Sequence, residues 1–106
     1  MRPEEIRKIF RNAADFEERR LTAGGTEITV FFLDGLTSGG DIAELVIRPM
    51  CENLHGGTPE ELMRQAEAGA VWCASVTRVA DADTVAEKLV NGFCVAVFSG
   101  ASEALC

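Results

Sequence analysis

The chain has 106 residues, of which 10 are basic and 17 acidic, giving a formal net charge of −7. This length suits one compact domain with a modest core, and the 47% hydrophobic and 25% charged fractions argue against disorder. The acidic balance argues against binding to nucleic acid, which requires clustered Lys and Arg. The longest apolar run covers residues 93–98, whereas a membrane helix needs about 20 residues. We therefore expect no direct membrane insertion by this segment.

The first predicted element is an amphipathic helix over residues 3–13. Ile6, Ile9 and Phe10 recur at helical spacing and so lie on one stripe. Pro3 suits the first helical turn. We expect this stripe mainly to pack on its own domain, and we also consider the same three side chains as candidates for an interface with a partner. Apolar residues here are interleaved with Arg and Glu, so we do not expect a signal peptide.

A β-hairpin is predicted next. Residues 27–33 are rich in β-branched and aromatic side chains, which is typical of a strand. Residues 15–21 fit either a strand or a continuation of the helix. The turn signal at Gly24 and Gly25 favours pairing the two segments as antiparallel strands, and Asp34-Gly35 closes the second one.

Two helices are predicted in the middle of the chain. Apolar residues recur at helical spacing over 42–54. Pro49 lies within this run and lacks a backbone N–H, so a kink or break is expected near Arg48. The sequence Thr-Pro-Glu-Glu at 58–61 predicts a second helix that begins with a capping box. This second helix is expected to end at Gly69.

The last third of the chain predicts two strands, one helix and a final edge strand. The later half of 71–79 reads as a strand, and a helix that follows an Asp cap ends at Gly92. The run 93–98 has no polar residue, which fits a strand buried on both faces. Residues 103–106 are predicted to begin an edge strand.

This alternation of strands and helices predicts the fold class. We expect a single α/β domain over residues 1–106, with a small mixed β-sheet of about four strands covered by helices on both faces, a three-layer sandwich.

Nucleophilic and metal chemistry have little support in the sequence. The four cysteines, Cys51, Cys73, Cys94 and Cys106, form no C-x-x-C pair, and His55 is the only histidine. Zinc sites use closely spaced ligand pairs, so we expect no metal and interpret the cysteines as free thiols in a reducing, cytosol-facing compartment. The four-residue spacing between Cys51 and His55 would place them on one helical face. Catalysis by that pair stays open as a weak alternative.

Cofactor binding is also not expected. Gly24-Gly25 and Ser38-Gly39-Gly40 are glycine clusters, but no Lys follows either one in the pattern of a phosphate-binding loop. The acidic residues lie mainly in first helical turns, where they complement the helix dipole. We therefore assign no catalytic residue and predict that the chain is not an enzyme.

Two turns form a candidate ligand-binding site. Ligands of open α/β sheets often bind beyond the carboxyl ends of strands. Asp34, Gly35 and Leu36 follow one predicted strand, and Ser99 and Gly100 follow another. We interpret Pro49 and Gly92 as structural turn residues.

Read in order, the chain resembles the A subunits of spore germinant receptors (the GerA family). The resemblance begins at residues 9–16, an apolar pair followed by an Asn-containing turn and an Asp. It continues at 30–36, where a strand ends in Asp-Gly-Leu, and at 42–50, an Ile-led helix ending in Pro-Met. Residues 85–100 are similar to the family's next helix, its Gly and its apolar strand. Ser99 stands where the family usually has Asp.

The resemblance covers about residues 9–105 and implies a role. It implies a non-enzymatic soluble module of a membrane receptor that senses nutrients and triggers spore germination, through subunit assembly, signal transfer or ligand contact. The implied partners are the remainder of the receptor chain and the other receptor subunits, with a nutrient germinant as a further candidate. Glu103 and Leu105 are then candidates for the surface where the rest of the chain docks.

The resemblance also implies that this domain is part of a larger N-terminal soluble region, and it implies a location. The receptor would sit in the spore inner membrane through a C-terminal part that follows this segment, and this domain would face the cytoplasm. The alternative reading is a free-standing α/β domain that binds a small molecule.

Overall fold

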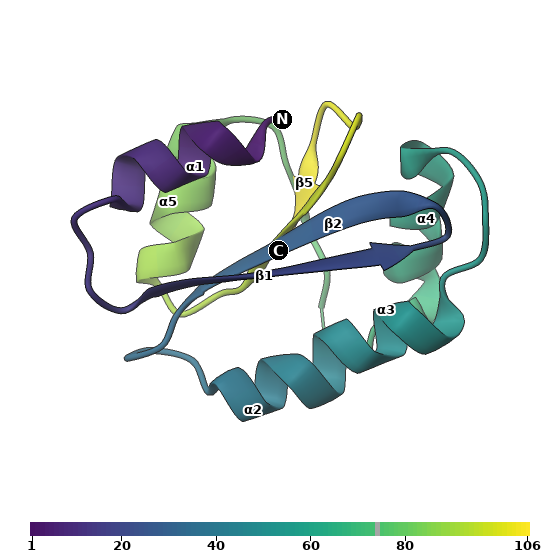
Figure 1. Cartoon of the computed structure of the whole chain (residues 1–106), viewed down its shortest axis with the longest axis horizontal. Coiled ribbons are helices and arrows are strands. Elements are labelled where there is room, and N and C mark those ends of the chain that lie inside the picture. Colours follow the sequence, from purple (N-terminus) through teal and green to yellow (C-terminus); the bar gives the residue numbers. More distant parts are fainter. Residues whose placement is uncertain (74) are drawn as a thin grey trace.

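The computed structural model describes residues 1–73 and 75–106, and these form three layers. A five-stranded sheet in the order β1-β2-β4-β5-β3 lies between helices α1 and α5 on one face and helices α2 to α4 on the other (Figure 1). This confirms the predicted α/β fold with both faces covered. The sheet has five strands where about four were predicted, and all its described pairings are antiparallel, so it is not the mixed sheet that we expected.

The N-terminal part forms the predicted helix and hairpin. Helix α1 spans Pro3–Phe10, and strands β1 (Phe16–Ala23) and β2 (Thr26–Leu33) pair along their whole length. Gly24 and Gly25 have φ of +61° and +81°, the two left-handed conformations that a two-residue type I′ turn requires. The segment that was ambiguous in the sequence is therefore a strand.

The next helical run continues through the predicted break. Helix α2 (Gly39–Ile42), the π-helical segment η1 (Ala43–Ile47) and helix α3 (Arg48–Asn53) follow one another without interruption, so the expectation of a break near Arg48 is wrong.

Proline is accommodated here in a specific way. Pro49 has no N–H to donate to the carbonyl four residues earlier, that of Leu45. A wider π-helical turn precedes the proline, and the Leu45 carbonyl instead accepts a hydrogen bond from the backbone N–H of Trp72 at 3.0 Å. The lost helical bond is thus replaced by a contact with a distant segment.

The remaining helices follow their local signals. Helix α4 (Pro59–Gln65) begins with the predicted capping box between Thr58 and Glu61, and the π-helical segment η2 (Ala66–Ala70) ends it at Gly69, whose φ is +115°. Asp81 accepts a hydrogen bond from the backbone N–H of Thr84 at 2.7 Å and so caps helix α5 (Ala82–Val90). Gly92, with φ of +87°, follows this helix as predicted.

The final strands depart from the prediction. Strands β3 (Arg78–Val79), β4 (Val95–Phe98) and β5 (Ala104–Leu105) complete the sheet. The expected edge strand β5 lies inside, between β4 and β3. Both of its residues are small or apolar and fully buried, which suits an interior strand, and the short β3 forms the edge.

Arg78 ties this end of the sheet to α4. Its guanidinium lies 2.7 Å from Glu60 and 2.7 Å from Glu67 on the helical side, and 3.5 Å from Glu103 before β5. Glu60 and Glu67 lie on the continuous helical run of α4 and η2, whereas Glu103 lies just before β5, so one cation holds the helix and the last strand together.

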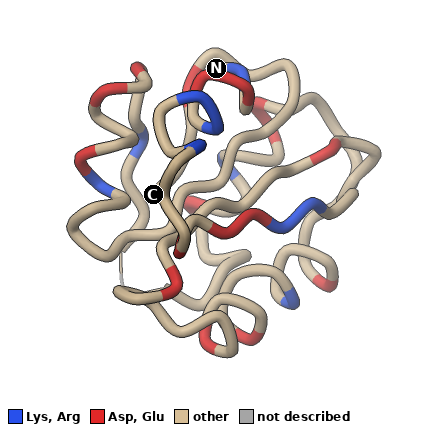
Figure 2. Tube along the Cα trace, turned by 60° about the vertical axis from the view of Figure 1, so that its left-hand side comes forward, with Lys and Arg blue, Asp and Glu red and all other residues tan. Residues whose placement is uncertain are grey.

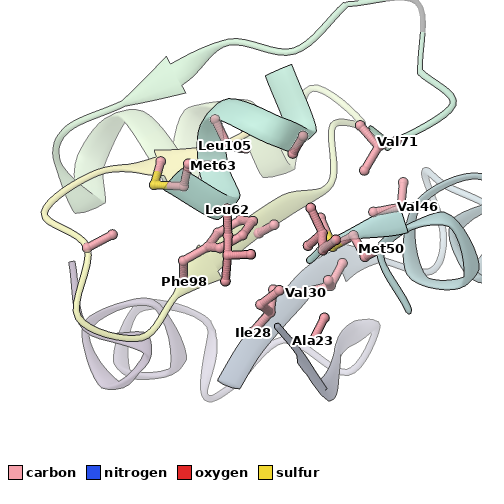
Figure 3. Packing of buried hydrophobic residues seen from close by; sticks show 14 of the residues in the cluster. Ala23, Ile28, Val30, Val46, Met50, Leu62, Met63, Val71, Phe98 and Leu105 are labelled. Carbon is pink, nitrogen blue, oxygen red and sulfur yellow. The ribbon is translucent and has the colours of Figure 1, made fainter. Parts of the chain in front are cut away.

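The core divides between the two faces of the sheet. On one face, side chains of α1 and α5 pack on Phe31, Val95 and Val97. On the other face, Leu62 and Met50 from the helices meet Ile28, Val30 and Phe98 of the sheet (Figure 3). All four β4 residues are buried, which explains why that run contains no polar side chain.

Candidate functional site

The two turns predicted to form one ligand site lie apart. Ser99 donates its N–H to the carbonyl of Glu27 at the start of β2, whereas Asp34 follows the last residue of that strand. Seven residues of extended strand separate these positions, roughly 20 Å. The expectation came from parallel sheets, in which strand ends gather at one edge; antiparallel neighbours point their carboxyl ends in opposite directions. The structure therefore does not bring Asp34, Gly35 and Leu36 together with Ser99 and Gly100.

Several residues proposed for an interface belong to the core. Ile6 and Leu105 are fully buried, and Phe10 is buried with its ring stacked on that of Phe16 at a centroid distance of 5.1 Å. These three side chains pack within the chain and are not available to a partner. Ile9 is exposed at the surface of α1, and Glu103 reaches the surface while bound to Arg78.

An apolar groove opens between η1 and the segment that precedes β4. Its volume is about 210 Å³. Leu45 is 43% exposed and Phe93 is 40% exposed, so two large apolar side chains stand in solvent at its walls. The apolar side chains and thiols that line it come from widely separated segments: Ile42, Leu45, Val46, Cys73, Phe93, Cys94 and Cys106.

Two further exposed side chains extend this groove. The hydrogen bond from Trp72 to the Leu45 carbonyl places Trp72, which is 51% exposed, beside the groove. Leu36, which is 56% exposed, lies next to Gly92, whose carbonyl accepts a hydrogen bond from the Thr37 hydroxyl at 2.7 Å. We call the groove with these neighbours the apolar surface: Leu36, Leu45, Trp72 and Phe93. Contiguous exposed apolar side chains mark interaction sites.

Sequence reasoning missed most of the apolar surface. The sequence favours Trp72 in the core or at a domain interface, and its exposure excludes the core of this chain. Leu45 fitted the buried stripe of its helix. Phe93 lay in a run that was assigned entirely to a buried strand, but β4 begins only at Val95. The sole sequence signal was the position of Trp72 among small residues, and that signal does not identify its neighbours.

A polar pocket of about 260 Å³ lies at the other end of the sheet. In the sheet register, Arg20, Thr29 and Val97 stand side by side across β1, β2 and β4, so their side chains share one face. The N-terminal end of α1 covers that face. The polar lining consists of Glu4, Arg7, Arg20, Glu27, Thr29 and Ser99.

Thr29 stands out in this pocket because it is only 1% exposed. Its neighbours on the same face further along the sheet are apolar, among them Phe31 and Val95. Arg7 is held by Glu18, with 2.8 Å between its Nε and the carboxylate Oε2. Guanidinium, carboxylate and hydroxyl groups thus surround a space that suits a small polar molecule. Ser99 is the one predicted ligand residue that lines it.

The thiols are in weakly nucleophilic settings. Burial raises the pKa of Cys73 and Cys106, and it raises the pKa of Cys94 to about 11. All three therefore stay protonated at neutral pH, whereas a nucleophile must be a thiolate. Cys51 lies on α3, but that helix ends at Asn53, so the helical spacing that would pair Cys51 with His55 is lost.

The described part of the chain has neither a cluster of metal ligands nor a membrane-spanning helix. Across residues 1–73 and 75–106, His, Cys, Asp and Glu side chains form no group of three that is arranged to hold a metal ion. Within the same ranges, the helices are too short or too polar to cross a membrane.

Fold and surface together define a three-layer α/β domain with an apolar surface at one end of its sheet and a polar pocket at the other. The sequence matches no family model and no curated protein. Among solved structures, the chain is similar to the N-terminal domain of the A subunit of the Bacillus megaterium spore germinant receptor GerK3, with a TM-score of 0.68 and 15% identity, over 96% of this chain and 84% of that one. The chain therefore has the fold of that domain, in agreement with the resemblance recognised in its sequence.

Proposed function

We propose that this chain is a non-enzymatic module of a spore germinant receptor A subunit and contributes to nutrient-triggered germination through subunit assembly and signal transfer. The fold shared with the GerK3 domain carries this proposal. The ordered motifs over residues 9–105 also support it, because they resemble those of the germinant receptor A subunits in order and spacing.

The apolar surface is the part of the module that docks. Trp72 is exposed, and tryptophan is among the side chains that dominate binding energy at interfaces. Its occupant in this proposal is the receptor segment that follows Cys106. Cys106 itself lines the groove, so a segment attached there begins beside the apolar surface. Glu103 lies close to the same end of the chain.

The proposed setting is the cytoplasmic side of the spore inner membrane, with the anchor supplied by the following receptor segment. Four free cysteines are typical of a reducing compartment, and this supports a cytoplasm-facing position.

Co-purification tests the docking proposal. The next soluble segment of a germinant receptor A subunit, taken from the reading frame that continues beyond Cys106, is mixed with this chain and the affinity is measured by calorimetry. Trp72→Ser removes a large apolar contact of this surface and is expected to weaken binding at least 30-fold, about 2 kcal/mol. Ile9→Ser is the matched control, because Ile9 is equally exposed but lies on α1. Binding that Ile9→Ser weakens and Trp72→Ser leaves unchanged would contradict the assignment of this surface.

The reading frame itself provides a second test. Continuation into a further soluble segment and several apolar stretches of about 20 residues would agree with a receptor subunit. A stop directly after Cys106 would refute it and leave a free-standing domain.

The polar pocket favours a second candidate function, binding of a small polar molecule. Thermal shift with panels of amino acids, sugars and nucleotides tests it. A ligand at 100 times its dissociation constant stabilises by about 2.7 kcal/mol, which raises the melting temperature by several degrees. Ser99→Ala in the pocket should reduce that shift, whereas Thr37→Val at the other end should preserve it. No shift with any compound would reject this candidate.

A further inference from the structure

Strand β1 is a long strand at the edge of the sheet. It has eight residues and lies outermost, next to β2. The odd-numbered residues of β1 form the hydrogen-bonded pairs with β2. The backbone N–H of Asp34 donates to the carbonyl of Asp15, and Ala23 pairs with Thr26 at the turn, which fixes this alternation. In an antiparallel ladder the alternate residues then direct their N–H and C=O groups away from the partner strand. Glu18 and Arg20 therefore present backbone donors and acceptors at the open edge.

The charges on this edge are arranged as two acids followed by two bases, Glu17, Glu18, Arg19 and Arg20. Figure 2 shows this order, red and then blue, along an extended stretch of the trace. Edge strands with a single sign of charge repel a second copy, which is a common protection against aggregation. Here the sign reverses in the middle of the strand, so an antiparallel second copy meets opposite charges.

We propose that a second copy of this chain pairs with β1 to form a two-fold dimer with a continuous sheet. A two-fold axis perpendicular to the sheet keeps each face on its own side, so each residue lies opposite one of the same parity. A register centred on Glu18 would oppose two like charges at Glu18 and place Phe16 against Arg20. A register centred on Arg19 places Glu18 opposite the partner's Arg20, and Arg20 opposite the partner's Glu18.

The side chains are already positioned for this register. Glu18 Oε2 is held by Arg7 at 2.8 Å, while its other oxygen, Oε1, lies 3.9 Å from Arg20 of its own strand. Oε1 is therefore weakly engaged and available to a second guanidinium. On the opposite face, the central Arg19 meets the partner's Arg19. Glu17 is a diagonal neighbour of the partner's Arg19 in this register, within reach of a long side chain, and this offsets the like-charge contact.

Analytical ultracentrifugation of the 106-residue chain tests the proposal. The wild type is expected to show a monomer–dimer equilibrium that weakens as salt increases, because exposed ion pairs are screened. Arg20→Glu places like charges opposite each other twice and should weaken the dimer at least 30-fold. The double variant E18R/R20E restores opposite charges and should recover most of that loss. Arg19→Ala removes the central repulsion and should tighten the dimer.

Two controls keep the result specific. Arg20→Pro removes the outward N–H together with the guanidinium, at an edge strand where proline is tolerated, and should abolish the dimer while circular dichroism stays unchanged. Trp72→Ser should leave the dimer intact, which separates this contact from docking at the apolar surface. A wild-type chain that stays monomeric at 1 mM in low salt would overturn the proposal. The proposal would also be overturned if the dimer persists in both the Arg20→Glu and the Arg20→Pro variant. Dissociation of the dimer by Trp72→Ser would overturn it as well.

Discussion

Replacing Thr29 with Val is expected to stabilise this protein. Thr29 is 1% exposed and forms part of an otherwise apolar sheet face. Its side chain borders the polar pocket, and the side-chain hydrogen bonds found among the described residues do not involve its hydroxyl. Valine has almost the same shape and is well suited to a strand. The substitution therefore replaces a hydroxyl that borders the pocket with a buried methyl group.

The expected gain is modest but measurable. A buried hydroxyl without a protein partner costs about 1–3 kcal/mol, and access to the pocket places Thr29 at the low end, about 1 kcal/mol. A domain of this size is stable by about 5–15 kcal/mol, so the gain is a noticeable fraction of the total. It corresponds to a rise of about 4 °C in the melting temperature.

Urea unfolding followed by far-UV circular dichroism measures this difference. Val95→Thr is the matched control, because Val95 is fully buried on the same sheet face and away from the pocket. This reverse change introduces a hydroxyl without access to solvent and should cost about 1–3 kcal/mol. Destabilisation of the Thr29→Val variant by 1 kcal/mol or more would refute the reasoning, because it would mean that the hydroxyl makes a stabilising bond.

Three other changes test the packing, a helix cap and the charges. Leu62→Ala opens a cavity where a fully buried side chain packs α4 on the sheet, so the free energy of unfolding should fall by about 3 kcal/mol. A decrease below 1 kcal/mol would show that this contact is loosely packed. Thr58→Ala removes the capping box of α4 and should cost about 1 kcal/mol in the same assay, with Thr58→Ser as the conservative control. Bonds to Arg78 lower the pKa of Glu67, and the N–H of Thr84 lowers the pKa of Asp81. The stabilisation that these two carboxylates give the folded state is therefore complete at pH values above their unfolded-state pKa values, about 4.3 for Glu and 3.9 for Asp. It is lost as the pH falls through their lower folded-state pKa values. Melting temperatures that stay constant from pH 6 to pH 3 would contradict this.

The parts of the fold that depend on neighbouring residues were predictable. The turn at Gly24 and Gly25, the capping box at Thr58 and the end of α5 at Gly92 each rest on signals within a few positions of the sequence. The resemblance over residues 9–105 added the larger context, and the three-layer fold agrees with it. The turn, the capping box and the helix end were predictable for one reason: the residues that determine each feature lie within the feature itself.

The features that depend on strand order were not predictable. β5 appeared to be an edge strand because its sequence does not specify its neighbours, yet it lies between β4 and β3. For the same reason the turns at Asp34 and Ser99 could not be assigned to opposite ends of the sheet. Pro49 was predicted to kink or break a helix near Arg48. The helix continues through a π-helical turn, and the Leu45 carbonyl accepts instead from a distant donor, the N–H of Trp72. The apolar surface could not be predicted from the sequence for the same reason, because its side chains come from segments that are far apart in the chain.

The interior position of β5 has a mechanical consequence. Cys106 exchanges backbone hydrogen bonds with Thr77, and the residues just before it pair with β4 on the other side. A pull on the chain at Cys106 therefore loads two strands at once. Through the guanidinium of Arg78 the same load reaches α4. A displacement at this end of the chain is thus passed to the two strands that flank β5 and to a helix.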